Sequence, residues 1–273
     1  MKLAKKLSKL FFVFSVLLFA FCLITNRAGI DKNAPRIAMD SEEIKVSIKD
    51  DKRELLKGVT ASDAKDGDVT DSLVVESVSN FIEEGRRKVS IVAFDSDNNI
   101  ARETRELVYT DYESPKFSLE SPLRFSFGDS DYMKGLTAKD CMDGDITSKI
   151  RIKYEEELDY GSVGEYKLTY TVSNSAGDAI KLPVTVEFYN EETASISRPE
   201  LSKYLIYLEK GKSFNPEKYI EGITGYAGGL ATSDIKIKNP VKSSEPGVYE
   251  VEYQLKDSEK RVGITRLIVI VEE

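Results

Sequence analysis

Six aspartates in two short segments are the residues best placed to do chemistry. The segment ASDAKDGDVTDSL (61–73) returns in altered form as TAKDCMDGDITSKI (137–150), and both contain Asp-Gly-Asp. The matching carboxylates belong to Asp63, Asp66, Asp68, Asp140, Asp143 and Asp145. Carboxylates this close together can ligate calcium, perform acid–base chemistry, or close a turn.

Calcium binding is one interpretation, because calcium takes about six to eight oxygen ligands and offsets the repulsion between clustered carboxylates. The spacing does not follow an EF-hand loop, however. With Gly67 at the glycine of that loop, Ser62 and Ala64 would occupy ligand positions, and Leu73 would stand where a bidentate glutamate belongs. The six aspartates therefore remain calcium candidates without a recognised loop.

A turn is the interpretation that the sequence favours. Asp-Gly is a strong turn dipeptide, because glycine accepts positive φ and the Asp side chain can bond nearby backbone N–H groups. A later stretch, GITGYAGGLATSD (222–234), begins with a similarly placed glycine, Gly222, and has almost no carboxylates. Glycoside hydrolysis would need a cleft between two carboxylates, which one turn of a small domain does not supply.

Most other catalytic chemistry is excluded by composition. The chain has no histidine, so it lacks the commonest general base and cannot build a Ser-His-Asp or Cys-His arrangement. Its two cysteines, Cys22 and Cys141, lie in unrelated contexts and predict no disulfide framework. We therefore expect a protein that is not an enzyme, with no cofactor apart from calcium at the candidate aspartates.

Three repeats must position these aspartates. Each repeat begins with a proline, charge, apolar triplet, at Pro35, Pro115 and Pro199. Each also contains a glycine followed by alternating apolar and polar residues, in GRRKVSIVA (85–93), GEYKLTYTV (164–172) and GVYEVEYQL (247–255). This period of two predicts half-buried strands. The alternation also predicts four core tyrosines: Tyr166, Tyr170, Tyr249 and Tyr253.

The repeats predict an all-β chain of tandem sandwiches, because short strands are separated by turn signals without a convincing helix. We predict domains at residues 31–112, 113–190 and 197–273. Residues 1–30 form a separate N-terminal region.

That N-terminal region predicts one transmembrane helix. Four lysines precede the apolar run LFFVFSVLLFAFCLI, Leu10 to Ile24, which spans roughly 23 Å as a helix. An uncleaved anchor is favoured over a cleaved signal peptide or a lipoprotein acylated at Cys22. The expected location is the plasma membrane, single-pass, with a cytoplasmic N-terminus and extracellular domains, or secreted if the segment is cleaved.

A family resemblance rests on three quoted features. ASDAKDGDVTDSL, then GEYKLTYTVSNSAGD and a closing strand, resemble bacterial immunoglobulin-like (Ig-like) surface repeats of the hyalin-repeat and pesticidal-crystal-protein type. The resemblance covers nearly all of 34–190 and weakens over 197–273, where Asp-Gly-Asp is absent. It implies extracellular, often tandem, non-catalytic Ig-like modules that act as spacers, adhesion modules or accessories to other domains.

The expected function is therefore structural, adhesive or protein-binding. The formal net charge of −8 argues against nucleic acid as a partner. We expect contact with the membrane through Leu10 to Ile24, and a cell-surface protein or glycan partner. The alternative is a carbohydrate-binding accessory module that acts on envelope glycans.

Overall fold

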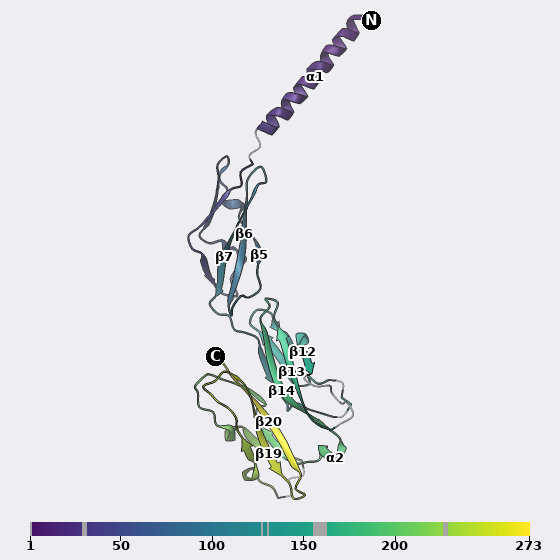
Figure 1. Cartoon of the computed structure of the whole chain (residues 1–273), viewed down its shortest axis with the longest axis vertical. Helices are drawn as coiled ribbons and strands as arrows, with labels where there is room; N and C mark the ends of the chain where they lie inside the picture. Colours follow the sequence, from purple (N-terminus) through teal and green to yellow (C-terminus); the bar gives the residue numbers. More distant parts are fainter. Residues whose placement is uncertain (1, 29–31, 127, 130, 155–162, 226–228) are drawn as a thin grey trace. The chain divides into compact units, whose positions relative to one another are not determined.

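The computed structural model describes residues 2–28, 32–126, 128–129, 131–154, 163–225 and 229–273. The chain separates into two compact units, Met1–Asp111 and Tyr112–Glu273. Apart from one N-terminal helix and a few short turns of helix, the described residues form β-sheets (Figure 1). The predicted all-β class is confirmed, whereas the three predicted domain boundaries remain predictions.

The N-terminal helix α1 (Lys2–Ala28) corrects the membrane prediction. Within the described residues, no helix is both long enough and apolar enough to cross a bilayer. The apolar run rises only roughly 23 Å, less than the roughly 30 Å of a hydrocarbon core. The predicted transmembrane helix and the single-pass plasma-membrane location are therefore wrong, whereas the predicted membrane contact through Leu10 to Ile24 remains a prediction.

The first unit contains one sandwich of two sheets. One sheet has the order β1 (Arg36–Met39), β3 (Val59–Asp63), β4 (Gly67–Asp68). The other has the order β2 (Glu43–Val46), β7 (Ile100–Tyr109), β6 (Arg86–Phe94), β5 (Val74–Val78). Strand β2 is parallel to β7, while the other pairs are antiparallel. Residues from both sheets, including Ile37, Ala61, Val89 and Leu107, form one buried core.

The second unit contains two further sandwiches. One sheet of the second sandwich has the order β11 (Gly144–Asp145), β10 (Leu136–Asp140), β8 (Lys116–Leu119). Its other sheet has the order β12 (Arg151–Tyr154), β13 (Gly164–Ser173), β14 (Ala179–Tyr189), β9 (Arg124–Ser126). The short helix α2 (Glu191–Ala194) follows. One sheet of the third sandwich pairs β15 (Arg198–Leu201) with β17 (Ile220–Thr224). Its other sheet has the order β16 (Leu205–Leu208), β20 (Val262–Val271), β19 (Gly247–Lys256), β18 (Lys236–Lys238).

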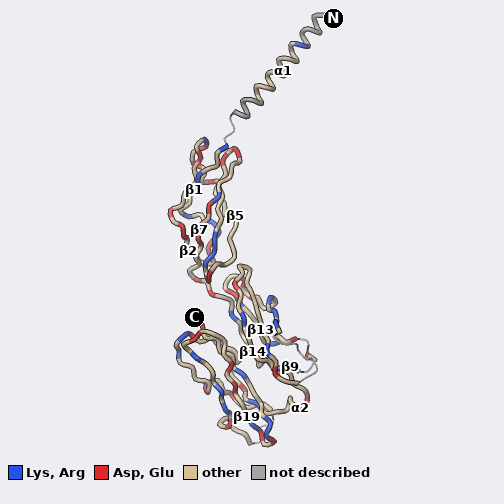
Figure 2. Tube along the Cα trace, in the orientation of Figure 1, with Lys and Arg blue, Asp and Glu red and all other residues tan. Residues whose placement is uncertain are grey.

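The predicted alternation positions the core. In β13, Leu168 and Tyr170 are completely buried, and in β19 the same is true of Val251 and Tyr253. Tyr166 and Tyr249 lie on the same strand faces as these residues. They are partly buried and pack against the two cores. The polar residues between them face outward, and Figure 2 shows Lys and Arg interspersed with Asp and Glu along both units.

Candidate functional site

The first aspartate segment is the turn between β3 and β4. Asp63, only 8% exposed, ends β3, and its Oδ1 accepts hydrogen bonds from the backbone N–H groups of Lys65 (2.8 Å) and Asp66 (3.0 Å). Gly67 follows with φ +76°, a conformation that glycine adopts without strain. The Asp63 carboxylate thus stabilises the turn through these two backbone hydrogen bonds.

The other two carboxylates of this segment fasten the turn to its surroundings. Asp66 accepts hydrogen bonds from the backbone N–H (2.8 Å) and the hydroxyl (2.9 Å) of Ser96, in the loop between β6 and β7. Asp68 accepts a hydrogen bond from the backbone N–H of Thr70 (2.9 Å), at the start of the 3₁₀ helix η2 (Thr70–Ser72). The hydrogen bonds of Thr70 lower the pKa of Asp68.

The second segment repeats this arrangement. Asp140 accepts from the N–H groups of Met142 (2.9 Å) and Asp143 (2.8 Å). Asp143 in turn accepts from the N–H (2.7 Å) and hydroxyl (2.6 Å) of Ser175, in the loop between β13 and β14. Asp145 accepts from the N–H of Thr147 (2.9 Å).

One further ion pair distinguishes the second turn. Lys149 Nζ lies 2.7 Å from Asp143. This ammonium, together with Ser175, lowers the pKa of Asp143. A general acid requires a raised pKa, so the shift is opposite to the one that acid catalysis needs.

A buried network also ties the start of the second sandwich to its turn. Asn174 Nδ2 donates to Asp140 (3.1 Å) and to the Tyr112 hydroxyl (2.9 Å). Tyr112 and Ser114 each donate to Asp178 Oδ2 at 2.6 Å. Burial, reinforced by Asp178, strongly raises the pKa of the Tyr112 phenol. Neutral donors therefore lie between the carboxylates of Asp140 and Asp178.

The six candidate aspartates thus act as hydrogen-bond acceptors, either within their turns or toward the neighbouring loops that contain Ser96 and Ser175. In the part of the chain that the structure describes, no group of three or more carboxylate or cysteine side chains is arranged to hold a metal ion. Calcium binding at Asp63, Asp66, Asp68, Asp140, Asp143 and Asp145 remains a prediction.

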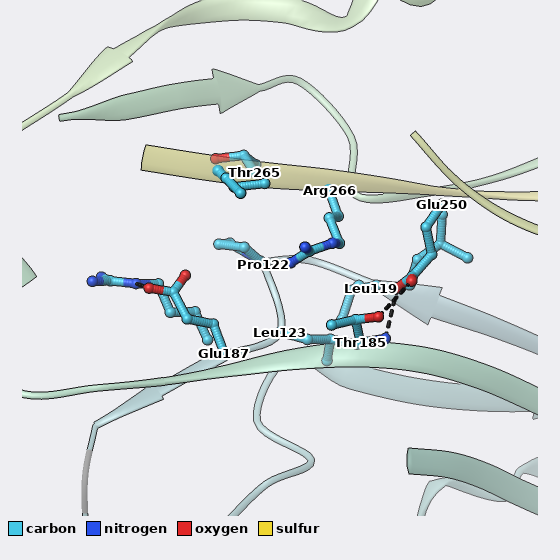
Figure 3. A pocket seen from close by; sticks show the side chains of 11 residues that line it. Leu119, Pro122, Leu123, Thr185, Glu187, Glu250, Thr265 and Arg266 are labelled. Atoms are coloured by element: carbon cyan, nitrogen blue, oxygen red, sulfur yellow. Dashed lines mark hydrogen bonds and ion pairs between the residues drawn. The ribbon is translucent and has the colours of Figure 1, made fainter. Parts of the chain in front are cut away.

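The sequence did not indicate a second polar cluster, which joins the second and third sandwiches. Glu250 of β19 accepts from the backbone N–H and from the hydroxyl of Thr185 on β14, both at 2.7 Å (Figure 3). The alternating pattern predicts that Glu250 faces outward on a half-buried strand. Only the position of the neighbouring sandwich turns it into an interface residue.

Arginines complete this joint. Arg198, only 7% exposed, pairs with Glu187 (2.8 Å), and Arg124 approaches the same carboxylate (3.2 Å). Arg266 of β20 pairs with Glu165 of β13 (2.8 Å). Arg124, Glu187 and Arg266 line a cavity of about 20 Å³ (Figure 3), which is large enough for one water molecule.

Apolar contacts continue across the same joint. Leu205 and Ile268 of the third sandwich belong to the buried core cluster of the second. The hydroxyl of Tyr207 accepts a hydrogen bond from the backbone N–H of Phe117 (2.7 Å). Lys116 pairs with Glu272 (3.2 Å). The joint therefore combines a shared core with charged and hydrogen-bonded contacts on both sides.

Comparison with known proteins places one segment in a described family. Residues 118–187 match the family described as "Bacterial surface protein, Ig-like domain". A 129-residue segment is 34% identical to the pesticidal crystal protein Cry22Aa of Bacillus thuringiensis, covering 45% of this chain and 16% of that protein. A 206-residue segment is 26% identical to an uncharacterized 81.3 kDa protein of Acholeplasma phage L2, covering 73% and 26%. The matches thus span 16% and 26% of the lengths of these curated relatives.

Solved structures show only distant likenesses. The CBM51-2 and INT domains of Clostridium perfringens ZmpB are 20% identical, with a TM-score of 0.24 over 54% of this chain and 25% of that one. The protocadherin gammaB4 extracellular domain is 13% identical, with a TM-score of 0.21 over 88% of this chain and 49% of that one. At these TM-scores neither structure informs the function.

Proposed function

Because residues 118–187 match a bacterial surface Ig-like domain, we propose that the chain is a non-catalytic structural segment of a surface protein. In this proposal the second and third sandwiches work as one stiff unit that holds its ends at a fixed separation. The observation that carries the proposal is the joint around Glu250, Glu187 and Arg266.

The composition of the joint supports stiffness. Inter-domain contacts within a chain ordinarily permit relative motion unless they are large and apolar. Here an apolar cluster that includes Leu205 and Ile268 is shared by both sandwiches. Glu250 adds two hydrogen bonds to a single residue, Thr185, which restrict rotation as well as separation. Loss of the Glu250 carboxylate would leave the backbone N–H and the hydroxyl of Thr185 without their acceptor, at a cost of about 1–3 kcal/mol.

The proposal is tested by ¹⁵N relaxation on the full chain. If the two sandwiches are one unit, amides of β13 and β19 report the same rotational correlation time. Glu250→Gln should make the two correlation times diverge, because its amide cannot accept both hydrogen bonds. Glu245→Gln is the matched control, since Glu245 pairs only with exposed Lys242 outside the joint. Different correlation times in the unmodified chain would refute the proposal, as would hydrolase activity of the purified protein.

A further inference from the structure

A groove lies beside the joint, between an edge strand of the second sandwich and the β15–β16 connection of the third. Its volume is about 580 Å³, within the roughly 300–1,000 Å³ typical of small-ligand sites, which often form between domains. One wall contains Ser118 and Glu120 of the second sandwich. The other contains Lys203 and three tyrosines, Tyr204, Tyr207 and Tyr219.

The three tyrosine rings are partly exposed and held in place. Tyr207 accepts the Phe117 N–H at 2.7 Å, and its ring lies 5.5 Å from the Lys116 ammonium. Tyr219 stacks on Phe214, with ring centroids 5.9 Å apart. Tyr204 packs against the cores of both sandwiches. Fixed rings lose little entropy when a ligand covers them.

Two exposed charges on the groove have no partner in the described part of the chain. Glu120 on one wall and Lys203 on the other make no side-chain hydrogen bond or ion pair among the described residues. One carboxylate and one ammonium cancel in formal charge. A ligand that is neutral overall, with groups that can donate to Glu120 and accept from Lys203, complements this lining.

An added β-strand fits the groove less well, although β8 is an edge strand. Strand addition requires the free N–H and C=O groups of that edge. The N–H of Phe117 is already taken by the Tyr207 hydroxyl, and the tyrosine itself stands where a new strand would lie. A peptide would have to displace this contact before it could pair.

We propose that this groove binds a short neutral oligosaccharide. Sugar rings present apolar C–H faces that can cover Tyr204 and Tyr219, and hydroxyl groups that can bond Glu120, Lys203 and Ser118. The groove therefore adds a binding role to the second unit, beyond the structural role proposed above.

The test applies the purified full chain to an array of printed neutral and acidic oligosaccharides, and measures the affinity of each bound sugar. We expect binding to at least one neutral oligosaccharide. Glu120→Gln and Lys203→Gln should each weaken it about tenfold, since each removes a hydrogen bond to a charged group. Tyr204→Ala should abolish it. The matched controls are Glu245→Gln and Tyr154→Ala, an exposed tyrosine that does not line the groove.

Three results would overturn the proposal. The first is no binding to any neutral oligosaccharide, and the second is equal affinity in Glu120→Gln and its control. The third is self-association of the chain that the groove substitutions abolish, which would assign the groove to a second copy. Glu120 and Lys203 are exposed, so their variants keep the test decisive if Tyr204→Ala fails to fold. Relaxation data separate this outcome from the stiff-unit proposal, because Glu120→Gln and Lys203→Gln change exposed side chains and leave the joint intact.

Discussion

The first and second sandwiches secure the same loop with different side chains. In the second, the hydroxyl of buried Tyr170 donates to the backbone carbonyl of Tyr132, in the loop that leads into β10. The matching position of the first sandwich is Ile91, which has no hydroxyl. There Arg105, from the neighbouring strand β7, donates to the carbonyl of Lys57 at 2.9 Å.

The third sandwich follows the second, since Tyr253 donates to the carbonyl of Pro216 at 2.8 Å. In all three sandwiches a buried side chain of one strand thus donates a hydrogen bond to a carbonyl of this loop, although the donor residue and its strand differ. The first sandwich carries the larger desolvation cost, because Arg105 is only 2% exposed and its Nε has no hydrogen-bond partner among the described residues. Burial lowers the pKa of its guanidinium.

Arg105→Ala should break the first tie with the largest effect. It opens a cavity and leaves the Lys57 carbonyl without its donor, for a loss of about 2–5 kcal/mol. Hydrogen exchange by mass spectrometry should show faster exchange throughout β6 and β7, but not in β13. Arg102→Ala is the control, because an exposed ion pair such as the one between Arg102 and Glu76 contributes little to stability. Equal effects of the two substitutions would contradict the account.

Glu250→Gln should separate the second sandwich from the third without touching the first. The loss of one or both bonds to Thr185 is expected to cost about 1–2 kcal/mol. Chemical denaturation followed by hydrogen exchange should show the loss in β14 and β19 together. A loss confined to β19 would show that the joint does not couple the two sandwiches.

Tyr170→Phe should have a smaller effect, because only the hydroxyl is removed from a completely buried ring. We expect a loss of about 1 kcal/mol, measured by urea denaturation. Tyr253→Phe provides the parallel measurement in the third sandwich. If both changes were neutral, the loop ties would not contribute to stability.

The smallest effect concerns the outer face of the first sandwich. Arg102 and Ser90 lower the pKa of Glu76 to about 2, from an ordinary value of 4.5. The pair therefore stabilises the fold fully above about pH 4.5, and the contribution fades as the pH falls toward 2. The melting temperatures of the unmodified chain and Glu76→Gln should differ at pH 7 and converge near pH 2. A constant difference over this range would contradict the assignment.

The sequence predicted features that depend on local pattern. Alternation along 164–172 and 247–255 predicted the buried Tyr170 and Tyr253, and Asp-Gly predicted turns that the structure contains at Gly67 and Gly144. The resemblance to bacterial Ig-like surface repeats is confirmed by the match of residues 118–187.

Features that depend on distant partners could not be predicted. Arg105 interrupts the apolar face of β7, and nothing in the sequence indicates that it donates a hydrogen bond to the carbonyl of Lys57. Glu250 and Thr185 both fall on positions that alternation assigns to solvent. The transmembrane prediction failed for a different reason, because the apolar run from Leu10 to Ile24 rises only roughly 23 Å, less than the roughly 30 Å of a hydrocarbon core.

Differential scanning calorimetry of the full chain tests the central claim that the second and third sandwiches are one unit. We expect one transition for Met1–Asp111 and one for Tyr112–Glu273, the latter with equal calorimetric and van't Hoff enthalpies. Three separate transitions, or a calorimetric enthalpy about twice the van't Hoff value for the second unit, would show that the sandwiches unfold independently and would contradict the account.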